Sequence, residues 1–159
     1  MTQPFLRFKD RGVLITGGAT GIGRATALAF AEHGAAVTLG DVDARGAAET
    51  VDSIRSRGGQ ALFIETDVSQ ARAVQALVAG AVERFGRIDC AFNNAGVLPP
   101  TLSITETDEA DFDRIIAVDL KGVFLCLKYQ IAAMLVGGGG AIVNTASVAG
   151  VIADPGMGA

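Results

Sequence analysis

Short runs typical of β-strands alternate with longer segments of helical periodicity along almost the whole chain. The β-type runs cover residues 12–16, 36–39, 61–66, 88–92 and 141–145. Segments in which apolar residues recur every three or four positions cover residues 22–33, 44–57, 70–85 and 107–136. Strands separated by helical crossovers pair in parallel, because each crossover returns the chain to the same end of the sheet. The sequence therefore predicts an α/β fold, a doubly wound parallel sheet of five strands with four helices on its two faces.

The size and charge of the chain fit one globular domain over residues 1–159. Half of the residues are hydrophobic and 19% are charged, and a chain of this length can bury a core without disulfides or metals. The formal net charge is −4, and Lys and Arg do not cluster, which argues against nucleic acid as a partner. We see no signal peptide and no membrane-spanning segment, so we expect a cytoplasmic protein.

The two cysteines, Cys90 and Cys126, stand in apolar segments without C-x-x-C spacing. We therefore expect reduced, buried thiols rather than a disulfide or metal ligands. The acidic residues that follow Thr107 have no His or Cys beside them and suit the first turn of a helix, so no metal site is predicted. Loops are predicted at Pro99 and Pro100 and from Ser147 to the last residue.

A glycine-rich turn, T-G-G-A-T-G-I-G over residues 16–23, follows the first β-type run directly. The beginning of a helix favours an anion, because backbone N–H groups and the positive end of the helix dipole point toward it. Glycine at positions 17, 21 and 23 leaves the backbone without a Cβ in the way. The turn therefore predicts the pyrophosphate site of a dinucleotide, while the alternative is a tight turn with a purely structural role.

Asp41 ends the second β-type run, 24 positions after Gly17. A carboxylate at this place can accept hydrogen bonds from an adenosine ribose and would repel a 2′-phosphate. Neither Thr20 nor Val42 supplies a basic partner for such a phosphate. NAD is therefore favoured over NADP, and the alternative is a helix-capping role for Asp41 beside Asp43.

Three motifs together resemble the short-chain dehydrogenase/reductase family in its compact, Rossmann-like form. The first is the glycine-rich turn, and the second is N-N-A-G at residues 93–96. The third is I-V-N-T-A-S-V-A-G at residues 142–150, which ends the fifth β-type run. The resemblance extends over residues 9–159.

The resemblance implies hydride transfer between a nicotinamide cofactor and an alcohol or ketone, with the cofactor carrying the difficult chemistry. It makes Ser147 the serine that hydrogen-bonds the substrate oxygen. The cofactor-binding residues that it and the turn predict are Gly17, Thr20, Gly21, Ile22, Gly23, Asp41, Asp67, Val68, Asn94, Ala95, Gly96 and Val118.

Asp119 is a departure from the family pattern, which has asparagine in the stretch V-N-x-x-G. In the family this residue acts largely through its backbone carbonyl, which holds a water of the proton relay, and aspartate keeps that carbonyl. We therefore expect Asp119 to contribute to catalysis. We also expect its carboxylate to be partly buried, which costs desolvation free energy unless it is paired.

The proton donor of the family is a tyrosine in Y-x-x-x-K, about thirteen positions after the serine. Counted from Ser147, that position falls just beyond Ala159, and Tyr129 is expected to pack in the core or an interface instead. We therefore expect the chain to be the N-terminal part of a longer one-domain enzyme. The alternatives are a truncated, inactive dinucleotide-binding module and a regulatory protein that has kept the fold and lost the chemistry.

The predicted helix over residues 107–136, capped by Thr107, carries apolar residues on all sides. One side has to cover the sheet, and the other needs a second partner. We expect this partner to be another subunit of a homodimer or homotetramer, while the alternative is burial within one larger chain.

Overall fold

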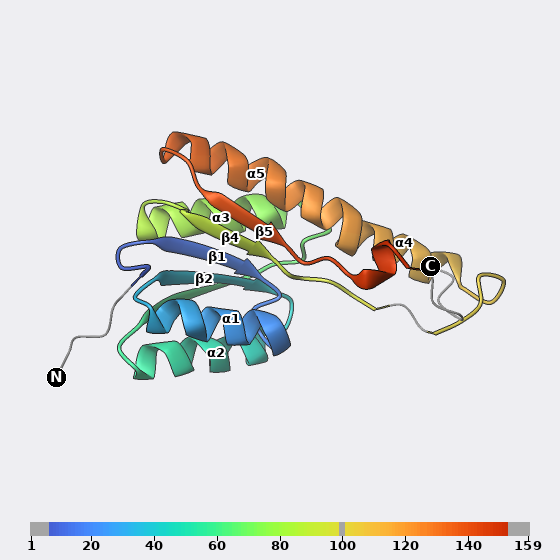
Figure 1. The fold of residues 1–159 in the computed structure, drawn as a ribbon, viewed down its shortest axis with the longest axis horizontal. Coiled ribbons are helices and arrows are strands. Elements are labelled where there is room, and N and C mark those ends of the chain that lie inside the picture. Colours follow the sequence, from blue (N-terminus) through green and yellow to red (C-terminus); the bar gives the residue numbers. More distant parts are fainter. Residues whose placement is uncertain (1–6, 99–100, 153–159) are drawn as a thin grey trace.

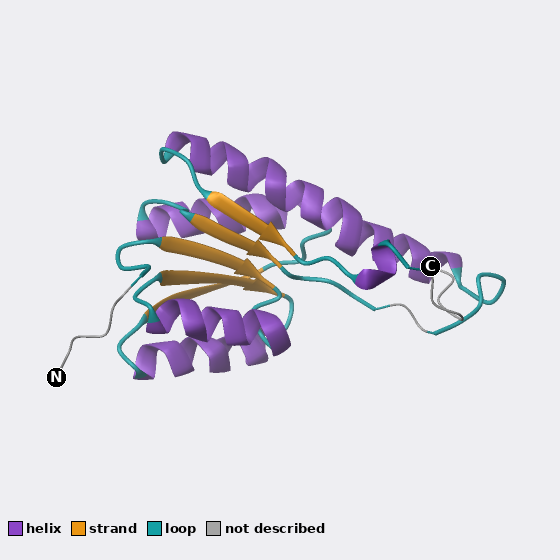
Figure 2. Cartoon of the chain, viewed as in Figure 1, coloured by secondary structure: helices purple, strands orange, loops and turns teal. Residues whose placement is uncertain are grey.

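The computed structural model describes residues 7–98 and 101–152 and contains one parallel sheet with helices on both faces (Figures 1 and 2). The strands are β1 (Gly12–Thr16), β2 (Ala36–Asp41), β3 (Gln60–Glu65), β4 (Cys90–Asn93) and β5 (Ala141–Asn144). The helices are α1 (Gly21–Glu32), α2 (Ala44–Ser56), α3 (Ala71–Phe85), α4 (Glu109–Ile115), the π-helix η1 (Ile116–Gly122), α5 (Val123–Val136) and the 3₁₀-helix η2 (Val148–Gly150). The predicted loop at Pro99 and Pro100 and the last seven positions of the predicted C-terminal loop lie outside the described residues.

The strand order is β3-β2-β1-β4-β5, and every neighbouring pair is parallel. This confirms the predicted doubly wound α/β fold. Beginning at β1, the chain moves outward through β2 and β3 and then crosses back to add β4 and β5 on the other side. The strand order therefore reverses between β1 and β4, and in open parallel sheets such a reversal leaves a crevice at the carboxyl ends of the strands.

The core has two layers because successive side chains of a strand point to opposite faces. Val13 and Ile15 face α1 and α2, in a cluster with residues of β2 and β3. Leu14 faces the other way and packs with residues of α3 and α5. All three side chains are at most 2% exposed. Full burial on both faces explains why β1 reads as a continuous apolar run rather than as an alternating one.

The predicted helix over residues 107–136 is present, but it starts later and is not regular throughout. Asp108, not Thr107, is the N-cap, since its Oδ1 accepts a hydrogen bond of 2.7 Å from the Ala110 N–H. The Thr107 hydroxyl instead donates to the Ser103 carbonyl at 3.0 Å. The helix then runs as α4, η1 and α5, so one π-helical segment interrupts it. Such widened turns often occur at functional sites.

Two further boundaries differ from the prediction. The helix α3 begins at Ala71, one position after the predicted start at residue 70, and its N-cap Gln70 makes no side-chain cap hydrogen bond. The strand β4 begins at Cys90 rather than at residue 88, because Cys90 is the residue in register with Val13 of β1. Ile88 is nevertheless buried in the core.

Both cysteines are free thiols, but only Cys126 is buried, so the prediction of a buried side chain is wrong for Cys90. Cys126, on α5, is 1% exposed, and burial raises the pKa of its thiol to about 12. Cys90 is half-buried; burial, and secondarily the charge of Asp89, raise the pKa of its thiol. None of the helices in the described part of the chain has both the length and the apolar character to cross a bilayer.

A buried carboxylate, Asp89, holds the edge of the sheet at which the strands begin. It accepts bonds of 2.6 Å from both Arg11 and Arg87 and one of 3.0 Å from the Gly12 N–H. Burial on its own raises the pKa of Asp89, but the hydrogen bonds from Arg11, Gly12 and Arg87 outweigh it, and the pKa is lowered from its ordinary value of 3.8. Asp89 and its two arginines thus join the segments that lead into β1 and β4.

Substituting Asp89→Asn should therefore lower the free energy of unfolding at pH 7 by about 1–3 kcal/mol, since it weakens charge-assisted hydrogen bonds. A carboxyl whose pKa is lower in the folded state stabilises the protein above its ordinary pKa, and this contribution disappears as the pH falls through the lowered value. Urea denaturation at pH 7 and pH 3 should show the difference between wild type and variant shrinking at pH 3. Asp52→Asn, at an exposed position of α2, is the control. A difference that is the same at both pH values would contradict the role of the charge.

Candidate functional site

A groove of about 870 Å³ lies at the carboxyl ends of the strands, where the strand order reverses. It contains every predicted site residue except Gly23. Those that line it are Gly17, Thr20, Gly21, Ile22, Asp41, Asp67, Val68, Asn94, Ala95, Gly96, Val118, Asp119 and Ser147. Residues that were not predicted as site residues also line it, namely Val42, Thr66, Asn93, Val97, Leu98, Val123, Thr145 and Ala146.

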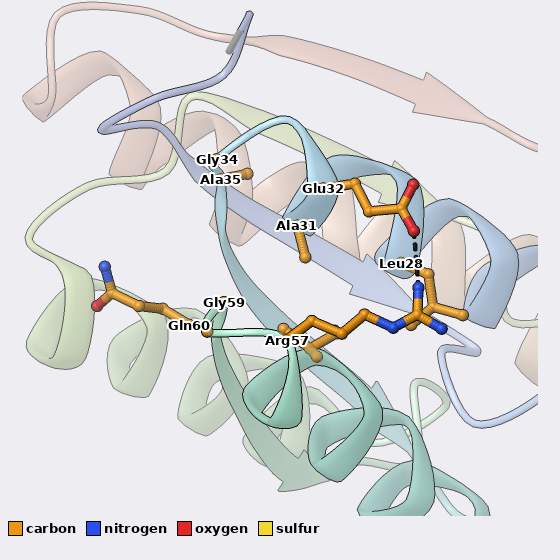
Figure 3. Close-up of a pocket in the computed structure, with 10 residues that line it drawn as sticks. Leu28, Ala31, Glu32, Gly34, Ala35, Arg57, Gly59 and Gln60 are labelled. Carbon is orange, nitrogen blue, oxygen red and sulfur yellow. Dashed lines mark hydrogen bonds and ion pairs between the residues drawn. The ribbon is translucent and has the colours of Figure 1, made fainter. Parts of the chain in front are cut away.

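A second hollow, of about 400 Å³, lies at the opposite edge of the sheet, between the ends of α1 and α2 and the beginning of β3 (Figure 3). Its two charged side chains, Glu32 and Arg57, form an ion pair of 2.7 Å with each other, and both are more than half exposed. The remaining lining is mostly small or apolar. The larger groove, at the reversal of strand order, is therefore the candidate functional site.

Gly17, Gly21 and Gly23, the three glycines predicted to leave the backbone open, serve different purposes. Gly17 has φ +69°, and a Cβ there would stand 2.9 Å from the backbone of Ala95. A Cβ on Gly23 would collide with the carbonyl of Gly17. These two positions need glycine because the turn packs closely on itself and on the segment after β4. Gly21 has φ +52°, and a Cβ there would meet no atom within 4 Å, so this position alone opens into free space.

The hydroxyl of Thr16 joins the turn to the segment that follows β4. Its Oγ1 accepts hydrogen bonds from the N–H groups of Asn94 at 3.1 Å and Ala95 at 3.2 Å. The side-chain amide of Asn94 donates in return to the Gly17 carbonyl at 3.3 Å. Thr16 is 1% exposed. Two groove walls that are almost 80 positions apart in the chain are thus held at a fixed distance.

The carboxylate of Asp41 is held by backbone groups on both of its oxygens. Oδ2 accepts from the Ala19 N–H at 2.8 Å, and Oδ1 accepts from the Asp43 N–H at 3.0 Å. The helix-capping role belongs to Asp43, whose Oδ1 accepts from the Gly46 N–H at 3.0 Å. Asp41 is therefore not the cap of α2, and its negative charge is fixed beside the glycine-rich turn, at the rim of the groove.

Asp67 and Val68 form the next part of the groove wall, after β3. Asp67 Oδ1 accepts from the Ser69 N–H at 2.9 Å and shapes the turn into α3. Val68 is 5% exposed and packs against Gly122, where an added Cβ would stand 2.8 Å from it. This close contact keeps the π-helix η1 next to the groove.

Asp119 lies on η1 with an exposed side chain, which corrects the expectation of a partly buried carboxylate. Its position at the rim keeps it in water, and it also has a partner: Oδ1 accepts from the Val97 N–H at 2.9 Å. Asp119 thereby connects the long helix to the segment after Gly96. Val118, its neighbour on η1, also lines the groove.

Ser147 follows β5, opposite the N-N-A-G segment. Its Oγ accepts from the Ala149 N–H at 3.2 Å and begins η2. Accepting this bond does not use the hydroxyl hydrogen, which Ser147 can still donate. Two positions before Ser147, the Thr145 N–H donates to the Asn93 carbonyl at 2.9 Å and continues the pairing of β4 with β5. The Thr145 hydroxyl donates to Asn94 Oδ1 at 3.2 Å.

Four residues that shape the groove were not predicted as site residues: Asn93 and Thr145 line it, while Thr16 and Gln130 support it from behind. Asn93 and Gln130 form a buried pair of side-chain amides between β4 and α5. One signal for Gln130 was visible, a lone uncharged polar residue in the apolar stretch of α5. Tyr129 packs against two core clusters, as predicted. Among the residues that the structure describes, no three His, Cys, Asp or Glu side chains are grouped to hold a metal ion.

Comparison with known proteins gives the family. A family model described as short chain dehydrogenase matches residues 11–159. An uncharacterized oxidoreductase of Thermotoga maritima is 46% identical over 150 residues, which are 94% of this chain and 59% of that protein. Levodione reductase of Leifsonia aquatica is 43% identical over 155 residues, which are 94% of this chain and 57% of the relative.

Solved structures give the same result. The crystal structure of an NAD⁺-bound xylitol dehydrogenase superimposes with a TM-score of 0.91 at 36% identity, over 95% of this chain and 58% of that one. The chain thus spans somewhat less than three fifths of the length of the proteins that it matches. The sequence match and the groove at the reversal of strand order agree, and the chain belongs to the short chain dehydrogenase family.

Proposed function

We propose that the groove binds NAD(H) and that the complete protein transfers hydride between this cofactor and an alcohol or ketone. The observation that carries the proposal is the glycine-rich turn, whose Gly21 opens into the groove while Asp41 stands fixed beside it. Two of the similar proteins are named as a levodione reductase and an NAD⁺-bound xylitol dehydrogenase. These names support a small alcohol or ketone as the substrate.

The residues present fit a dinucleotide. The open side of Gly21 at the beginning of α1 would admit a pyrophosphate to the backbone N–H groups and the positive end of the helix dipole. The carboxylate of Asp41 would accept hydrogen bonds from the ribose hydroxyls. The walls at Asp67 and Val68 would border the adenine. The segment from Asn94 to Gly96 would lie along the remaining part, together with Thr20, Ile22 and Val118.

When bound, the nicotinamide supplies or accepts the hydride. The residues of the chain then orient the substrate. The Ser147 hydroxyl would donate a hydrogen bond to the substrate oxygen, which would fix the reacting carbon and stabilise the charge that develops on that oxygen. Asp119 is proposed to contribute its backbone carbonyl to a proton relay, and its carboxylate holds the Val97 N–H. Cytoplasmic location and the absence of nucleic acid as a partner stay predictions of the sequence.

Substituting Ser147→Ala in the complete protein should lower kcat by about 100-fold, since one preorganised donor to the substrate oxygen is lost. The dissociation constant for NADH should change less than about threefold, because Ser147 is proposed to touch substrate rather than cofactor. Turnover of xylitol with NAD⁺ and of levodione with NADH provides the first assays, and cofactor fluorescence gives the binding constant. Ser56→Ala, at the end of α2, is the control. Binding of NADH without turnover of any alcohol or ketone would support an inactive or regulatory dinucleotide-binding protein instead.

Substituting Asp41→Asn should reduce the preference for NADH over NADPH by at least about tenfold, which corresponds to about 1.4 kcal/mol. The substitution removes the charge that repels a 2′-phosphate, while the amide oxygen can still accept from the Ala19 N–H. Dissociation constants for both cofactors measure the ratio. The exposed Asp113→Asn on α4 controls for the change in net charge. An unchanged ratio would exclude Asp41 as the determinant of cofactor choice.

We also propose that the long helix forms the interface of a homodimer or homotetramer. Leu120, Phe124 and Leu135 are 64%, 61% and 72% exposed, which leaves an apolar face uncovered on η1 and α5. The double substitution Leu120→Glu/Phe124→Glu should convert the oligomer to monomer in sedimentation velocity. Leu120→Met/Phe124→Leu, which keeps the apolar surface, should not. A wild-type protein that sediments as a monomer would refute the proposed interface.

A further inference from the structure

Gln130 is a fully buried polar residue in a helix that is otherwise mostly apolar. It lies on α5 and is 0% exposed. A buried amide without partners costs free energy, and a leucine or methionine would fill the same space without that cost. We therefore expect the hydrogen bonds of Gln130 to explain why a polar residue is buried at this position.

The amides of Gln130 and Asn93 bind each other reciprocally. Gln130 Nε2 donates to Asn93 Oδ1 at 2.7 Å, and Asn93 Nδ2 donates to Gln130 Oε1 at 3.1 Å. Asn93 Nδ2 also donates to Asn144 Oδ1 at 2.9 Å. Asn93 and Asn144 are the last residues of β4 and β5 and are paired in register. One side chain of α5 thus holds the amide that connects the ends of two strands.

These strand ends are the points from which two walls of the groove depart. Asn94, Ala95 and Gly96 follow β4, and the segment up to Ser147 follows β5. Both segments are exposed or half-exposed, whereas Asn93 is 3% exposed. Hydrogen bonds are directional, so a satisfied buried amide pair selects one arrangement of the strand ends, which packing of apolar side chains would select less sharply.

We propose that Gln130 is a positioning residue: through its reciprocal amide pair with Asn93, it fixes the ends of β4 and β5 and so the place of Ser147 relative to the segment Asn94 to Gly96. Gln130 does not touch the groove itself. Its effect on the reaction rests on the function proposed above, whereas its effect on the two segments does not.

Hydrogen exchange tests, without any ligand, whether Gln130 fixes the segments that follow β4 and β5. Gln130→Met keeps the length and the apolar volume of the side chain but removes both hydrogen bonds to Asn93. In the complete protein, the backbone amides of Asn94, Ala95 and Thr145 should exchange at least about tenfold faster than in wild type, while those of β2 and α1 should not change. Asn144→Ala, at an exposed position, removes the link on the β5 side and should accelerate exchange at Thr145 without disturbing the core.

Met134→Ala is the matched control, because Met134 lies one turn further along α5 and is buried but does not bind Asn93. It should lower the melting temperature without selectively accelerating exchange at Asn94, Ala95 and Thr145. Unchanged exchange at these amides in Gln130→Met would overturn the proposal. So would the same selective acceleration in Met134→Ala, since it would show that general loosening of the core is sufficient.

Steady-state kinetics test whether Gln130 also affects the proposed reaction. Gln130→Met should lower kcat by at least about tenfold, because small displacements of a substrate-orienting group have large effects on rate. The dissociation constant for NADH should stay within about threefold, since the turn and Asp41 are untouched. Faster exchange with an unchanged kcat would reduce Gln130 to a purely structural residue and overturn the assignment. A wild-type protein that binds no NADH would refute the proposed function, and hydrogen exchange would still decide whether Gln130 positions the segments.

Discussion

The hydroxyl of Thr16 is the small group on which the groove depends most. Thr16 is the last residue of the central strand β1, and its hydroxyl oxygen accepts hydrogen bonds from two backbone N–H groups of the segment after β4. Those N–H groups lie beyond the end of β4, in a half-buried place where the sheet offers them no acceptor, and Thr16 supplies one. A valine of nearly the same shape would leave both without one. The same contact brings the turn so close to Ala95 that only glycine fits at position 17.

The two edges of the sheet have separate tasks because all strands run in one direction. At the edge where the strands begin, Asp89 and its arginines provide charge-assisted hydrogen bonds that stabilise the fold. At the edge where they end, backbone groups and a fixed carboxylate line the groove. The parallel topology places every βα turn at this second edge, so functional residues from five distant segments meet there. Substitutions at one edge can therefore change stability while the chemistry at the other is kept.

The sequence predicted well those features that follow from local patterns. The order of strands and helices followed from periodicity, and the turn and Asp41 followed from their places after predicted strands. The exposure of Asp119 could not be predicted, because it depends on the place of η1 at the rim of the groove, which the packing of the long helix decides. Gln130 is a similar case. Its partner Asn93 is 37 positions away, and only the packing of α5 over β4 brings the two amides together. Local patterns thus located the groove walls, while the contacts that hold the walls depend on tertiary structure.

Because Cys126 is buried on α5, its reaction with an alkylating reagent can be used to follow the opening of the long helix. Burial raises the pKa of the Cys126 thiol to about 12, which disfavours the reactive thiolate as long as the side chain stays packed. Alkylation therefore requires α5 to move away from Val68 and Val74, which pack with Cys126 in one core cluster, and its rate measures how often this occurs. The amide pair of Gln130 lies one turn further along the same helix. Alkylation of Cys126, followed separately from that of the half-buried Cys90, can consequently record the opening of the layer that supports the groove, without any introduced label.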